Sequence, residues 1–240
     1  MSVSLEYGKL KRTGFYPAFV GGGLLAAAIP IANTALRQDV FTSVKESPFV
    51  VLMDANWQMM AMLNVFMIVI GACIVYHIEY ADNALQKMEA LPAKGESMFF
   101  SKCFVLAAAS VFMIALETAA LAFCVRCWFS PPEDFAAQLF SSMGFATALS
   151  VPAVILMMGI SSACRNMWIS LGIGVIGIFA TVVIPPGSLI LSMFPFTLPF
   201  QTFSGAGEGE AGELLLGALV EMAVFCAAEL VYLRIRRNVQ

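Results

Sequence analysis

The sequence predicts an all-α polytopic membrane protein with six transmembrane helices. Of its 240 residues, 60% are hydrophobic and 12% are charged, whereas soluble domains carry about 25% charged residues. The mean hydropathy is +0.85. Apolar runs of about 20 residues, the length that crosses a bilayer, recur six times. We therefore expect a single transmembrane domain over residues 1–240 and no separate soluble domain.

The N-terminal residues 1–14 mix charged and apolar side chains. This pattern predicts a short amphipathic elbow helix on the membrane surface. The first span follows over residues 15–36, and its apolar run is too long for a signal peptide, which favours an uncleaved anchor. The charged positions are Glu6, Lys9, Lys11 and Arg12, and the apolar ones are Leu5, Tyr7 and Leu10.

Five further apolar runs complete the six spans, over residues 57–78, 103–125, 139–164, 168–184 and 214–233. Positively charged loops stay in the cytoplasm. Because most of the 13 Lys and Arg residues fall on the side that holds both termini, both termini are predicted to be cytoplasmic, in a plasma membrane. That side holds Lys9, Lys11, Arg12, Lys87, Lys94, Lys102, Arg165, Arg234, Arg236 and Arg237, and the other holds Arg37, Lys45 and Arg126.

Two loops have their own predicted structure. The cytoplasmic segment 79–102 has mixed charge and places Leu85, Met88 and Leu91 at helical spacing before Pro92, which predicts a short amphipathic helix. The outer segment 185–212 is rich in proline and has an apolar centre that is too short to cross the membrane. It is expected to form a re-entrant or interfacial element between spans five and six.

Two carboxylates fall deep inside predicted spans, Glu117 in span three and Glu221 in span six. An ionisable group at the bilayer centre costs about 2.5–3.5 kcal/mol on the insertion scale. They either line an internal pathway for a cationic substrate or a proton, or make hydrogen bonds to a neighbouring helix or subunit. Glu79 and Glu229 lie near the cytoplasmic boundary, where Lys102 and Arg234 are candidate partners.

Other motifs exclude several functions. The GxGxxG match at 172–177 lies within a span and is interpreted as helix packing, and no P-loop motif occurs. The single histidine, His77, cannot supply a haem or catalytic metal site alone, so no metal is predicted. Cys124 and Cys127 have the CxxC spacing of a redox pair, half a metal site or a loop staple; without a second pair or histidine partners they are interpreted as structural, and their redox state stays open. The near-balance of 13 basic and 16 acidic residues argues against nucleic acid as a partner.

Three stretches carry a resemblance to a known family. The first is the basic E-x-x-K-L-K-R pattern from Glu6 to Arg12, and the second is Asn56-Trp57 at the opening of span two. The third is the order Glu79, then Leu91-Pro92, then Lys102. Together they resemble the permease subunits of type-2 ABC exporters, and most closely the small permeases of lantibiotic or bacteriocin immunity.

The resemblance implies a mechanism and a set of partners. The chain would not be an enzyme and would hold no cofactor, because two separate ATPase subunits would bind ATP and Mg²⁺. A second permease chain, identical or paralogous, would complete a pathway that exports a hydrophobic or cationic, lantibiotic-like peptide and so confers antibiotic resistance. The expected ATPase-docking residues of the coupling helix are Glu79, Asp82, Leu85, Lys87, Met88, Glu89, Leu91 and Pro92.

Three alternatives remain. An ion-coupled secondary transporter would use Glu117 and Glu221 as proton carriers, although no inverted repeat is visible between the two halves of the chain. A membrane enzyme would need clustered polar residues at one membrane face, which the sequence lacks. An anchor subunit of a redox complex would need histidine pairs, and the chain has one histidine.

Overall fold

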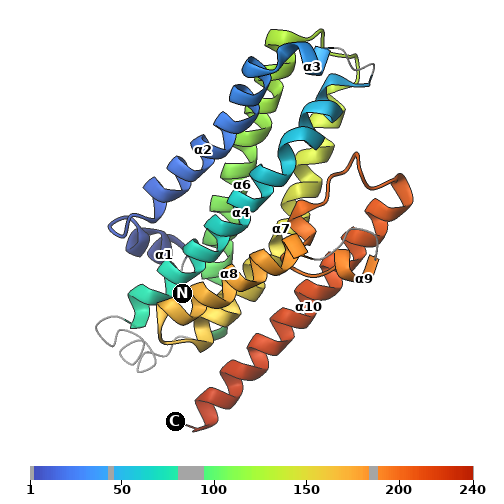
Figure 1. The fold of residues 1–240 in the computed structure, drawn as a ribbon. Coiled ribbons are helices and arrows are strands. Elements are labelled where there is room, and N and C mark those ends of the chain that lie inside the picture. Colours follow the sequence, from blue (N-terminus) through green and yellow to red (C-terminus); the bar gives the residue numbers. More distant parts are fainter. Residues whose placement is uncertain (1–2, 43–45, 81–94, 184–188, 240) are drawn as a thin grey trace.

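The computed structural model describes residues 3–42, 46–80, 95–183 and 189–239, and over these ranges the chain is helical without β-strands (Figure 1). The predicted all-α class is therefore confirmed. The elements are α1 (Val3–Leu10), α2 (Phe15–Leu36), α3 (Gln38–Thr42), α4 (Pro48–Tyr80), α6 (Gly95–Trp128), α7 (Phe135–Ala163), α8 (Met167–Val183), α9 (Leu189–Ser192), the 3-10 turn η2 (Leu198–Phe200) and α10 (Glu208–Val239).

Five helices are long and apolar enough to cross a membrane, namely α2, α4, α6, α7 and α10. The chain is thus a multi-pass membrane protein. The predicted span 168–184 corresponds to α8, a shorter apolar helix of 17 residues. At 1.5 Å per residue it is about 25 Å long, the lower end of the length that spans a bilayer.

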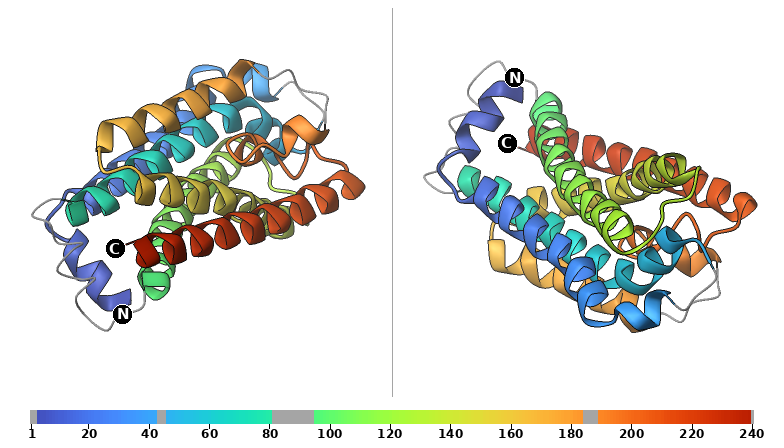
Figure 2. Two further views of the ribbon diagram at one scale, coloured as in Figure 1. Left: turned by 90° about the horizontal axis from the view of Figure 1, so that it is seen from below. Right: turned by 90° about the horizontal axis from the view of Figure 1, so that it is seen from above.

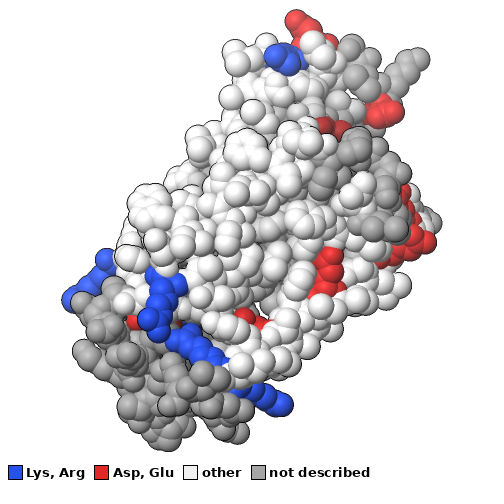
Figure 3. Space-filling view, turned by 60° about the horizontal axis from the view of Figure 1, so that its bottom comes forward, with Lys and Arg blue, Asp and Glu red and all other residues white. Residues whose placement is uncertain are grey.

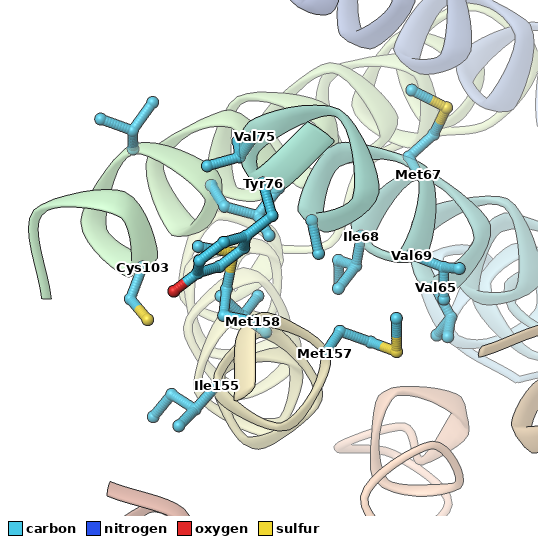
Figure 4. Packing of buried hydrophobic residues seen from close by; sticks show 14 of the residues in the cluster. Val65, Met67, Ile68, Val69, Val75, Tyr76, Cys103, Ile155, Met157 and Met158 are labelled. Carbon is cyan, nitrogen blue, oxygen red and sulfur yellow. The ribbon is translucent and has the colours of Figure 1, made fainter. Parts of the chain in front are cut away.

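Helix α4 forms the centre of the bundle and packs against α2, α6, α7 and α8 (Figure 2). Of the residues in the most apolar stretch of α4, 67% are buried inside the protein, compared with 17% for the corresponding stretch of α10. Figure 4 shows the core where α4, α6 and α7 meet, with the ring of Tyr76 lying among Cys103, Met158 and their neighbours. Helix α10 runs along one edge and contacts mainly α7.

The glycines of the GxGxxG match serve close packing, as predicted. A Cβ atom on Gly174 would lie 2.5 Å from Val69 Cγ1 of α4, and one on Gly177 would lie 2.6 Å from Phe196 Cε2. A Cβ atom on Gly172 would meet nothing within 4 Å. Two of the three glycines therefore let α8 approach its neighbours closely.

The predicted N-terminal helix is present as α1 and is joined to α2 by a sharp turn. Gly14 has φ 79°, a left-handed conformation that glycine adopts readily. Across the turn, the hydroxyl of Tyr16 donates a hydrogen bond to the carbonyl of Tyr7 at 3.1 Å. Leu10 is buried in the core, whereas Leu5 is exposed.

One predicted boundary is wrong. Asn56 and Trp57 were expected to open span two, but α4 begins at Pro48 and both residues lie inside the helix. Proline is favoured in the first turn of a helix, where its missing N–H is not needed. The helix continues through polar residues such as Asp54. The apolar run therefore indicates only the part of α4 that can lie in the hydrocarbon region, and not where the helix begins.

Candidate functional site

The segment 79–102 joins α4 to α6 at the end of the bundle that also holds α1 and the C-terminal end of α10. Of its predicted docking residues, Glu79 is the one within the described part of the chain. The others lie outside the described residues: Asp82, Leu85, Lys87, Met88, Glu89, Leu91 and Pro92.

Glu79 and Lys102 form an ion pair that connects the two ends of this segment. Lys102 Nζ lies 2.7 Å from Glu79 Oε1, and their side chains are 2% and 3% exposed. Lys102 and Arg234 were the two candidate partners for the boundary carboxylates Glu79 and Glu229, and Lys102 pairs with Glu79. A buried charge-assisted hydrogen bond of this length is strong, and removal of one partner leaves the other charge unpaired in the interior. The pair therefore fixes the end of α4 against the start of α6.

Two further charges join α1 to this pair, and we call the four residues the ion cluster. Lys9 of α1 lies 3.5 Å from Glu79 Oε1 and 2.8 Å from Glu6 Oε1. Lys102 Nζ also lies 5.3 Å from the centre of the Tyr76 ring, within cation–π range. The ion cluster thus contains two acidic and two basic side chains and links α1, α4 and α6.

The remaining boundary carboxylate, Glu229, has a different partner from the one expected. Its Oε1 accepts a 2.6 Å hydrogen bond from the hydroxyl of Ser162 in α7, while Arg234 lies 3.7 Å from Glu96 at an exposed position. The hydroxyl of Tyr80 donates to the carbonyl of the same Ser162. This polar cluster joins the ends of α4 and α7 to α10, which otherwise has little buried surface.

Charge is distributed unevenly between the two ends of the molecule. Figure 3 shows most of the visible Lys and Arg atoms gathered at one end, and Asp and Glu atoms over the other end and along one flank. Among the described residues, the basic end carries Lys9, Lys11, Arg12, Lys102, Arg165, Arg234 and Arg236 together with Glu6, Glu79, Glu96 and Glu229, and the opposite end carries Asp39, Glu46, Asp54, Glu133, Asp134, Glu210 and Glu213 together with Arg37 and Arg126.

Glu117 and Glu221, the two predicted pathway residues, have different surroundings. Glu117 of α6 is 0% exposed, and its Oε2 accepts a 2.8 Å hydrogen bond from the side-chain nitrogen of Asn64 in α4. Glu221 of α10 is partly buried, and its Oε2 has no hydrogen-bond partner among the described residues. No hydrogen bond among the described residues joins the two carboxylates.

The described part of the segment between α8 and α10 folds back onto the bundle. The indole nitrogen of Trp57 donates a 3.1 Å hydrogen bond to the carbonyl of Pro199 in η2. Phe196 is buried in the main core, and Leu198 packs with Leu214 of α10 in a smaller apolar cluster. This segment therefore contacts α4, α7 and α10.

The free cysteines and the histidine are possible metal ligands by residue type, and their surroundings differ. No group of three His, Cys, Asp or Glu residues gathers in the described part of the chain. Cys124 is buried and Cys127 is exposed, and both are free thiols. His77 is exposed near the end of α4.

Sequence reasoning missed three of these partners: Asn64, Ser162 and the Glu6–Lys9 pair. Asn64 carried a usable signal, because an amide within an apolar run needs a hydrogen-bond partner. Spacing along one helix does not identify the residue opposite on another helix, so the partner itself was not predictable. The same holds for Ser162, which lies 67 residues from Glu229 in the chain.

Comparison with known proteins identifies the family. Residues 2–181, which include α1 to α7 and all but the last two residues of α8, match the family model described as "ABC-2 family transporter protein". No curated protein and no solved structure matches the chain. The matched region covers well over half of the chain, and its apolar helices agree with a membrane subunit. The protein belongs to the ABC-2 transporter family, as a transport subunit that resides in the membrane.

Proposed function

We propose that the chain is the permease subunit of an ABC exporter and is driven by a separate ATPase. The observation that carries this proposal is the family match over residues 2–181. ATP binding would close two ATPase copies, and the coupling helices of two permease chains would pass this motion to the helices. The second permease chain is either a copy of this chain or a paralogue.

The charge distribution supports a six-span topology with both termini in the cytoplasm. In this arrangement α8 is the fifth span, and the basic end of the molecule faces the cytoplasm, as the positive-inside rule requires. Helix α1 then lies at the cytoplasmic surface as the elbow helix, and residues 185–212 form the outer re-entrant element.

The ion cluster supports the assignment of segment 79–102 as the coupling helix. Force applied to a docking segment reaches the spans only if the ends of the segment are held firmly. The buried pair Glu79–Lys102 provides this connection to α4 and α6. We propose that the docking surface itself is formed by Asp82, Leu85, Lys87, Met88, Glu89, Leu91 and Pro92, with Glu79 holding its base.

The acidic outer end supports a cationic, amphipathic peptide as the substrate. Glu221 is the candidate pathway carboxylate, because it lies on the least buried of the five long helices and one of its oxygens has no hydrogen-bond partner in the described part of the chain. Negative charge along a path raises the local concentration of a cationic substrate. Lantibiotic-like peptides fit this chemistry, and their export would confer resistance.

Co-purification tests the proposal. The full chain is purified in mild detergent together with the soluble proteins encoded near it, and ATP hydrolysis by the complex is measured. We expect a P-loop ATPase to co-purify with the chain. Leu85→Asp and Met88→Asp should remove it, because a charge in an apolar docking contact is left without a partner.

Val40→Asp is the matched control, because Val40 is 61% exposed in α3 at the opposite end of the bundle. This variant should retain the ATPase. A chain that purifies without any ATPase, or docking variants that bind it as well as Val40→Asp does, would contradict the proposal. Ion-coupled transport through Glu117 and Glu221 would then be the function to test.

A further inference from the structure

The contact between Glu117 and Asn64 contains two unsatisfied oxygen atoms. Asn64 Nδ2 donates to Glu117 Oε2 at 2.8 Å. The other terminal atoms of the same two side chains, Asn64 Oδ1 and Glu117 Oε1, are both buried and have no hydrogen-bond partner among the described residues. Buried polar atoms nearly always have a partner, and one left without costs about 1–3 kcal/mol.

The surroundings of Glu117 do not favour a negative charge. The side chain is 0% exposed, and no salt bridge of the described Lys, Arg and His residues includes it. On its own helix, Ile114 and Leu121 are buried on either side, and Met60 and Ala61 of α4 belong to the same apolar cluster. A bare carboxylate in such a place would lack both solvent and a counter-charge.

One proton resolves both defects. A carboxylate and an amide oxygen are both acceptors, so neither can satisfy the other. If Glu117 Oε1 carries a proton, it becomes a donor, and Asn64 Oδ1 is the unsatisfied acceptor on the side chain already bound to it. The amide oxygen and nitrogen of Asn64 could be assigned the other way round. One carboxylate oxygen would then still face the amide oxygen, so the proton would still be needed.

We propose that Glu117 is a neutral carboxylic acid and that it forms a reciprocal pair with Asn64, in which each side chain donates one hydrogen bond to the other. Oε1–H donates to the amide oxygen, and the amide N–H donates to Oε2. The pair joins α4 to α6 in the bundle interior and has no net charge. Glu117 is then a positioning residue of the helix bundle, and Glu221 is the carboxylate that remains available to a cationic substrate.

Infrared spectroscopy of the full chain in lipid nanodiscs tests the assignment directly. The C=O stretch of a protonated carboxyl group is well separated from the stretches of a carboxylate. The difference spectrum between wild type and Glu117→Gln at neutral pH should show loss of a protonated carboxyl band. Loss of a carboxylate band instead would overturn the proposal.

Glu96→Gln is the matched control, because Glu96 lies on the same helix and its side chain is 42% exposed beside Arg234. Its difference spectrum should show loss of a carboxylate band. Asn64→Leu should shift the Glu117 carboxyl band without abolishing it, since the O–H loses its acceptor. An unshifted band in Asn64→Leu would contradict the reciprocal pair, and this spectrum does not depend on how well Glu117→Gln folds.

Thermal unfolding provides a second readout. Glutamine reproduces the donor and the acceptor of a neutral glutamic acid, so Glu117→Gln should unfold within roughly 2 °C of wild type, whereas Asn64→Leu should unfold at least 2–4 °C lower. If the unfolding temperature fell equally in the two variants, the neutral pair would be contradicted. A charged Glu117 could not be replaced by glutamine without a loss of stability.

Discussion

Lys102 and Glu79 form a charge pair that is almost fully removed from solvent, at the base of the segment proposed to contact the ATPase. Two ions in the interior are stable only while both are present, because each one compensates the desolvation of the other. Lys9 lies farther from Glu79, at 3.5 Å, and its side chain is 30% exposed. Lys102 is therefore the main partner of Glu79.

Replacement of Lys102 by methionine should destabilise the protein by about 3–5 kcal/mol, because Glu79 is left as a buried charge with only Lys9 nearby. Arg234→Met is the control. Arg234 is 75% exposed and 3.7 Å from Glu96, and loss of such a surface pair costs about 0–1 kcal/mol. Thermal unfolding in detergent measures both, and equal stability of the two variants would contradict the role of the ion cluster.

At the scale of helices, the first span was predicted with its observed bounds, residues 15–36, because Gly14 and Arg37 limit a continuous apolar run. The bounds of α4 and α10 were predicted less well. At 33 and 32 residues they are about 50 Å long, which exceeds the hydrocarbon thickness of a bilayer. An apolar run indicates where a helix crosses lipid, and it does not indicate where the helix ends.

The candidate site was predicted in part for a related reason. Lys102 was one of two candidate partners for Glu79, because both residues lie near the predicted cytoplasmic boundary. Glu117 was recognised because a carboxylate in a span is costly, but its partner Asn64 lies 53 residues away on another helix. Contacts between distant helices depend on how the helices pack and rotate, and a single sequence does not contain this information in readable form.

Glycine substitutions in α8 test whether this helix packs as described. Gly174→Ala should destabilise the protein by about 1–3 kcal/mol, because the new methyl group would overlap the stiff side chain of Val69. Gly172→Ala should be neutral or slightly stabilising, since its Cβ atom meets nothing within 4 Å and alanine favours helix. The melting temperatures of the two variants measure this difference. A Gly174→Ala protein as stable as wild type would show that α8 does not pack against Val69 as described.

At the scale of the whole molecule, the proposed orientation places Cys127 at the outer end of α6 and Arg165 at the cytoplasmic end of α7. Cys127 is an exposed free thiol, whereas Cys73, Cys103 and Cys124 are buried. The protein thus contains a natural probe of its own topology.

A membrane-impermeant maleimide added to intact cells should label the wild-type chain and leave Cys127→Ser unlabelled. In the Cys127→Ser background, Arg165→Cys should react only after the cells are lysed. The opposite pattern, in which the Arg165→Cys variant is labelled from outside and Cys127 is protected, would reverse the orientation and remove the coupling segment from the cytoplasm.

The energy source for transport is the most direct test of the account. The chain is reconstituted with its co-purifying ATPase in inverted vesicles, and uptake of a fluorescent cationic amphipathic peptide is measured with ATP and after ionophores collapse the ion gradients. We predict uptake that requires ATP and the ATPase and persists without gradients. Because one screened charge contact contributes about 1 kcal/mol, Glu221→Gln should reduce it about fivefold. Uptake by the chain alone that follows an ion gradient would contradict the account.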